Sequence, residues 1–78
     1  MTFECSTKKE ARRIALAIET MTGNPPGLFP LDRGRYRVQE NEYDRDWEEA
    51  LEALLATGTK AVECTRERVE QQMEAMTG

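Results

Sequence analysis

The chain has 78 residues, of which 33% are charged and 6% aromatic, and its formal net charge is −4. A chain of this length predicts one domain, residues 1–78, that buries only roughly 60% of the surface exposed when unfolded, so its core is small. The sequence holds two cysteines and no histidine, which excludes a zinc site of four Cys and His ligands within one chain. We therefore expect no metal and no cofactor.

The N-terminal segment does not have the pattern of a targeting signal. Residues 1–5 read Met-Thr-Phe-Glu-Cys, without the basic stretch and apolar run of a signal peptide. No apolar run approaches the roughly 18 residues that a membrane-spanning helix needs. The sequence therefore predicts a cytoplasmic protein that does not enter a membrane.

A short strand and a helix are predicted at the start of the chain. Residues 2–5 alternate polar and apolar side chains, as a half-buried strand does. Thr7 and Glu10 then form a capping-box pattern that marks the start of a helix, and Gly23 ends it. The apolar side chains between them share one helical stripe. They are Ala11, Ile14, Ala15, Ile18 and Met21.

Residues 23–34 contain all three prolines and three of the five glycines, which predicts an internal loop. Within it, residues 28–31 are apolar and could be extended; they either cover the open end of the core or serve as a peg for a partner. Residues 32–34 have turn chemistry. Residues 35–40 then alternate, with Tyr36 and Val38 on one face, which indicates a strand.

A second helix is predicted over residues 42–57, with Asn41 as its N-cap and Gly58 as its end. Trp47 lies in the middle of its apolar face, so we expect this side chain to anchor the core; the alternative is an exposed binding hot spot. The other members of this apolar face are Tyr43, Ala50, Leu51, Leu54 and Leu55.

Two interpretations remain for the last segment. In the one we prefer, residues 60–64 form a strand and Thr65 caps a helix over residues 66–76, because Val-Glu-Cys-Thr at 62–65 echoes Phe-Glu-Cys-Ser at 3–6. In the other, one helix starts near Thr59. The sequence thus predicts an α+β fold, with a small β-sheet of short strands packed with three amphipathic helices; a three-helix all-α domain is the alternative.

The residues needed for catalysis are missing. Ser6 is the only serine and lies at a predicted cap, and no phosphate-binding glycine motif or nucleophile elbow occurs. The carboxylates fall on solvent-facing helical positions, whereas a catalytic acid needs a desolvated cleft. We expect a protein that is not an enzyme. Cys5 and Cys64 fall on apolar strand faces, where we expect buried, reduced thiols; a redox pair is the alternative.

Charge divides the chain into two halves. Residues 1–39 carry seven Lys and Arg against four Asp and Glu, and residues 40–78 carry four against eleven. An acidic surface repels nucleic acid and attracts basic partners. Its candidate partner-binding residues are Glu48, Glu49, Glu52, Glu63, Glu67, Glu70 and Glu74, of which the last four would form one ridge of carboxylates.

The leading hypothesis is a non-enzymatic small acidic binding protein. It would occupy a basic, nucleic-acid-handling site on a larger protein, as nucleic-acid-mimicking phage-type inhibitors such as anti-CRISPR proteins do. In this hypothesis direct nucleic-acid binding is disfavoured. A regulatory RNA- or DNA-binding module using the first helix is the second hypothesis, with candidate residues Lys8, Lys9, Arg12, Arg13 and Leu16. A homo-oligomer or subunit of an assembly, joined through Met73 and Met76, is the third.

Overall fold

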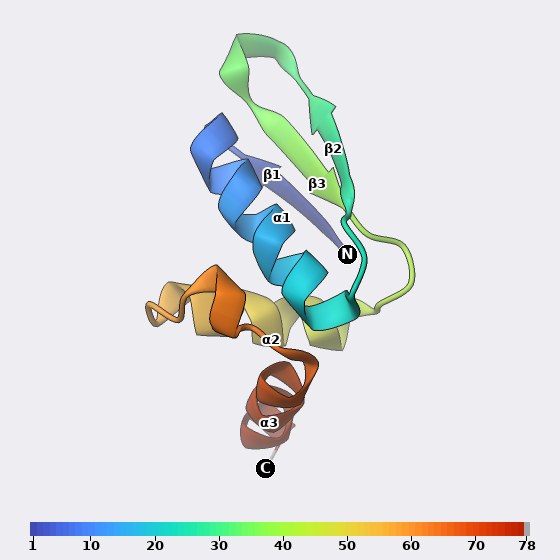
Figure 1. The fold of residues 1–78 in the computed structure, drawn as a ribbon, viewed down its shortest axis with the longest axis vertical. Helices are drawn as coiled ribbons and strands as arrows, with labels where there is room; N and C mark the ends of the chain where they lie inside the picture. The colour runs from blue at the N-terminus through green and yellow to red at the C-terminus, as the bar shows by residue number, and fades with distance from the viewer. Residues whose placement is uncertain (78) are drawn as a thin grey trace.

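Residues 1–77 have an α+β fold, as predicted: a three-stranded antiparallel sheet accompanied by three α-helices (Figure 1). The structure is a computed structural model and describes residues 1–77. The strands are β1 (Thr2–Cys5), β2 (Gly27–Pro30) and β3 (Tyr36–Gln39). The helices are α1 (Lys8–Thr22), α2 (Arg45–Ala56) and α3 (Arg66–Thr77), with 3₁₀ turns η1 (Asp32–Gly34) and η2 (Ala61–Glu63).

The strand order is β1-β3-β2, so β3 is central. Phe3 of β1 and Leu28 of β2 both lie opposite Val38 of β3. Because side chains alternate along a strand, Phe3, Cys5 and Val38 point to one face, which α1 covers (Figure 1). This face of the sheet and α1 form the upper half of the core.

Helix α1 begins and ends as the sequence predicts. The Thr7 hydroxyl accepts a hydrogen bond from the Glu10 amide at 3.1 Å, and Gly23 adopts the left-handed conformation (φ 84°) that closes the helix. Its buried stripe includes Ala17 and leaves Ala15 only partly buried. The remaining members of the stripe are buried as expected.

Residues 27–30 form a paired strand rather than a loop, which corrects the main prediction for this segment and agrees with its extended alternative. Leu28 and Phe29 are 38% and 49% exposed, so they do not cover the end of the core. The reason is position: β2 is an edge strand, and of the three strands α1 packs mainly on β1 and β3.

The second helix starts later than predicted, because Asp44 and not Asn41 is its N-cap. The Asp44 carboxylate accepts hydrogen bonds from the amides of Asp46 and Trp47, at 3.1 and 3.4 Å. Upstream, the Glu40 carboxylate accepts hydrogen bonds from the backbone amides of residues 42 and 43, and these bonds hold residues 40–43 in a turn. The helix ends at its C-cap Thr57, just before Gly58, which has a positive φ as expected.

The predicted strand at residues 60–64 does not form; its middle is the 3₁₀ turn η2. Ala61 and Cys64 are buried while Val62 is 60% exposed, so the burial spacing is three residues and not two. The segment packs against α1 and is not part of the sheet formed within residues 1–77. A continuous helix from Thr59 does not form either, since α3 begins at Arg66 as preferred.

One continuous core joins the sheet, α1, α2, η2 and the first half of α3. Its largest fully buried apolar side chains include Ile18, Val38, Leu51 and Val69. Trp47 is only partly buried and packs against the edge of this core, so it does not lie at the centre of the core. The molecule measures 40 × 24 × 19 Å, with the β2–β3 hairpin at one end and α3 at the other (Figure 1). Within residues 1–77, no helix has the length and apolar character to cross a bilayer.

A candidate binding groove between α2 and α3

A groove of about 480 Å³ lies between the first turn of α2 and the second half of α3. Its apolar surface comes from Trp47 of α2 together with Met73 and Met76 of α3. Carboxylates border this surface on both helices. They are Asp46 and Glu49 on α2, and Glu70 and Glu74 on α3. Thr77 of α3 completes the lining, and we call the hollow defined by these eight residues the α2–α3 groove.

Trp47 is held in place by neighbours on both sides of its sequence position. Its ring meets that of Tyr43 edge to face, with the centroids 5.1 Å apart and the planes at 81°. The Arg66 guanidinium lies over the ring, 5.5 Å from its centroid. These two contacts fix the orientation of the indole.

Helix α3 buries little of its apolar surface. Val69 is its one buried residue within 66–77, Met73 is partly buried, and Met76 is 47% exposed. The two methionines are three positions apart, so they lie on the same side of the helix. Flexible thioether side chains at such a position adapt to differently shaped ligands.

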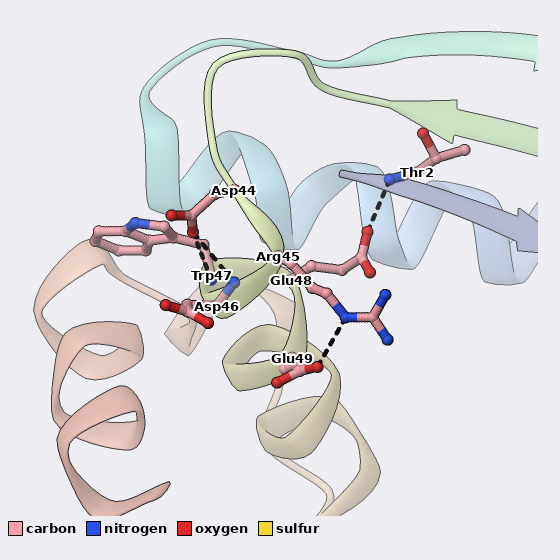
Figure 2. Close-up of polar contacts among 7 residues, drawn as sticks. All are labelled: Thr2, Asp44, Arg45, Asp46, Trp47, Glu48 and Glu49. Carbon is pink, nitrogen blue, oxygen red and sulfur yellow. Dashed lines mark hydrogen bonds and ion pairs between the residues drawn. The ribbon is translucent and has the colours of Figure 1, made fainter. Parts of the chain in front are cut away.

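The charges on the border of the groove are only partly neutralised. Glu49 pairs with Arg45 at 3.0 Å (Figure 2), and Glu70 pairs with Arg66 at 3.1 Å. Both pairs are exposed and each is worth little in stability. Within residues 1–77, the structure has no ion pair for Asp46 or Glu74. These two carboxylates supply unpaired negative charge, one from each helix.

The other acidic candidates on α2 face a different way. Glu48 accepts a hydrogen bond from the Thr2 amide at 2.9 Å, which ties α2 to β1 (Figure 2). Glu52 borders a second hollow of about 370 Å³, beside Phe3 and Arg13. Of the three α2 glutamates that the sequence singled out, only Glu49 belongs to the α2–α3 groove.

The predicted ridge of four carboxylates on the last helix is incomplete. Glu63 lies in η2, before α3 begins, and its carboxylate accepts the Lys60 amide at 3.3 Å. Glu63 and Glu67 border a small hollow of about 210 Å³ together with Arg68. The structure therefore brings Glu70 and Glu74 to the groove and leaves Glu63 and Glu67 outside it.

The basic alternative on α1 is also divided. Lys8, Lys9 and Arg12 are exposed, as is Leu16 at 43%. Arg13 is exposed as well, but it donates a hydrogen bond to the Leu55 carbonyl at 3.0 Å. A cation at this place satisfies a carbonyl in the last turn of α2 and complements the negative end of its dipole. Arg13 thus has a structural partner within the domain.

The two cysteines are free and buried. Burial raises the pKa of both thiols; the charge of Glu10 adds to this at Cys5, whereas Arg13 and Arg68 oppose it at Cys64. Protonated thiols are poor nucleophiles. Within residues 1–77, no three Cys, Asp or Glu side chains are grouped so that they could hold a metal ion.

Asp46 is not among the partner-binding residues predicted from the sequence. The sequence pattern also gave no reason to group Trp47 with Met73 and Met76. A partial signal was present, since Met73 and Met76 alternate with Glu70 and Glu74 on consecutive turns of one helix. The chain shows no significant similarity to a protein-family model, to a curated protein or to a solved structure.

Proposed function

We propose that this is a non-enzymatic binding protein whose α2–α3 groove holds a basic surface of a larger protein. The observation that carries the proposal is an apolar surface of Trp47, Met73 and Met76 bordered by carboxylates from two helices. The apolar surface would contribute affinity, because tryptophan is enriched among the residues that dominate binding energy. The carboxylates would select a basic partner and speed its association.

Proteins that handle nucleic acids are the first partner class to consider, because their phosphate-binding surfaces carry clustered Lys and Arg side chains. A bound acidic domain would compete with the nucleic acid for that surface. This is the mode of action of a nucleic-acid-mimicking inhibitor. It is supported by the charge of the groove and by the −7 balance of residues 40–78.

Direct binding of RNA or DNA is the weaker candidate. Lys8, Lys9, Arg12 and Arg13 are all exposed, but Arg13 already donates a hydrogen bond to the Leu55 carbonyl of α2, which leaves three cations without an internal partner on this helix face. Glu10 and Glu19 share the same helix. Three cations with acidic neighbours give few phosphate contacts, and phosphate contacts supply most of nonspecific affinity.

An affinity capture with two charge-matched variants tests the proposal. The groove variant is Asp46→Lys with Glu74→Lys. The control variant is Glu19→Lys with Glu42→Lys, two exposed positions outside the groove. Each variant replaces two carboxylates with two lysines, so the two variants have the same net charge. Circular dichroism must first show that both variants keep the helicity of the unmodified protein.

We expect basic proteins from host cytoplasm to be retained by the unmodified protein and the control, and lost with the groove variant. Retention should also fall as salt rises. Equal retention by the groove variant would show that the acidic groove is not the binding surface. A mobility shift with nucleic acid at low salt would instead favour the basic α1 face.

A further inference from the structure

The second half of α3 lacks the burial that usually keeps a short helix folded. Beyond Val69 the helix buries no residue completely, and Met73 and Met76 face the groove. Isolated helices of this length are marginal in water, and most helical stability in proteins comes from packing of an apolar face. A partner that covers the two methionines would therefore stabilise α3 as well as bind to it.

The walls of the groove restrict the shape of what can lie in it. Both walls are α-helices, whose backbone amides and carbonyls are already bonded within each helix. An extended peptide would find no sheet edge there to pair with, whereas a helix brings its own backbone hydrogen bonds. Along α3 the groove runs from residue 70 to residue 77, about 10 Å at the rise of an α-helix.

That span matches two turns of an incoming helix, the distance over which apolar residues at i, i+3, i+4 and i+7 form one stripe. Carboxylates border the apolar surface on both sides, Asp46 and Glu49 from α2, Glu70 and Glu74 from α3. A helix that fills the groove would then need basic residues on both flanks of its apolar stripe.

A second copy of this chain fits the groove poorly. In a symmetric dimer the same patch meets itself, so the carboxylates that border the groove in one copy would approach those of the other copy. Like charges placed together across an interface oppose binding. This charge argument disfavours the homodimer through Met73 and Met76 and favours a partner of opposite charge.

Building on the proposed function, we infer that the occupant of the α2–α3 groove is a basic amphipathic α-helix of the partner protein. Its apolar stripe lies on Trp47, Met73 and Met76. Its Lys and Arg side chains reach the carboxylates on both borders, and its binding orders the second half of α3.

Two synthetic peptides of identical composition test this inference. Each has about 18 residues, enough to form a helix on binding, and contains leucine, lysine and alanine. In the first, leucines stand at i, i+3, i+4 and i+7, so they form a stripe on a helix. In the second, leucines alternate with other residues, so they form a stripe on a strand. Emission from Trp47, the only tryptophan, reports on the groove directly.

We expect the helix-patterned peptide to bind at least about tenfold more tightly than its isomer. The circular dichroism of the peptide mixed with the protein should show more helix than the sum of the two separate spectra. The variant Asp46→Lys with Glu74→Lys should lose this binding, and Glu19→Lys with Glu42→Lys should keep it. Equal affinity for the two isomers would overturn the helical shape and leave the proposed basic partner standing. Retained binding by the groove variant would overturn both. Sedimentation of the free protein as a dimer that Met73→Lys dissociates would show a second copy as the occupant.

Discussion

Replacing Trp47 with alanine should weaken binding more decisively than it weakens the fold. Truncating a fully buried tryptophan costs about 3 to 5 kcal/mol. Trp47 is only partly buried, and its specific contacts are the edge of Tyr43 and the guanidinium of Arg66, each worth about 1 kcal/mol. We therefore expect the free energy of unfolding to fall by about 2 kcal/mol. A domain of this size has about 5 kcal/mol to lose, so the variant should remain folded.

Urea unfolding followed by far-ultraviolet circular dichroism measures this loss, because the substitution removes the fluorescent side chain. Leu51→Ala is the matched comparison: Leu51 is fully buried on the same helix and should cost more, about 3 to 4 kcal/mol. Calorimetric titration with the helix-patterned peptide should show a loss of at least about 30-fold for Trp47→Ala, as expected of a binding hot spot.

Two results would refute the reasoning. A stability loss equal to or larger than that of Leu51→Ala would make Trp47 the core anchor that the sequence suggested. Unchanged peptide affinity in a folded Trp47→Ala variant would remove the indole from the binding surface and, with it, the argument that this groove is the functional site.

Three further predictions concern the start of α2 and the thiols. Asp44→Ala should lower the free energy of unfolding by about 1 kcal/mol and Asn41→Ala by a few tenths, measured by urea titration; the reverse order would restore Asn41 as the cap. Cys5 and Cys64 should react slowly with iodoacetamide until the protein is unfolded, and rapid reaction of the native protein would contradict their burial. Burial raises the pKa of both thiols, so the thiols of the unfolded chain ionise first as the pH rises past 9.0. The free energy of unfolding should therefore fall above that pH. This decline should be smaller in a variant in which Cys5 and Cys64 are both replaced by alanine.

The parts of the fold that the sequence predicts correctly are those whose signals are local. The Thr7 cap, the apolar stripe of α1 and the Gly23 end lie within one helix, and each acts through neighbouring residues. The start of α2 is less determined, because Asn41 and Asp44 are both good N-caps. Which of the two residues caps α2 depends on Glu40. Its carboxylate accepts hydrogen bonds from the amides of residues 42 and 43, and its own amide donates a hydrogen bond to the Met1 carbonyl. That contact is between segments far apart in the sequence.

The segment from 60 to 64 shows the same limit. A five-residue stretch with apolar residues at 61, 62 and 64 fits a strand or a turn of helix equally well. Packing of Ala61 and Cys64 on α1 selects the 3₁₀ turn. For the candidate site, the acidic composition of α2 and α3 was visible in the sequence. Which carboxylates share one groove depends on how the two helices pack, and that separates Glu49, Glu70 and Glu74 from their neighbours.

The long axis of the molecule also separates its charges. The net-positive residues 1–39 include the hairpin and the start of α1 at one end, whereas the net-negative remainder includes α3 at the other (Figure 1). This charge distribution gives the molecule an electric dipole, so we expect the field of a positively charged partner to rotate it before the two surfaces touch. The α3 end would turn to face the partner, and the tip of the hairpin would point back into solvent. A tag, dye or second domain inserted at the hairpin tip would therefore lie on the side of the molecule that faces away from the partner, and we expect it to leave the association rate unchanged.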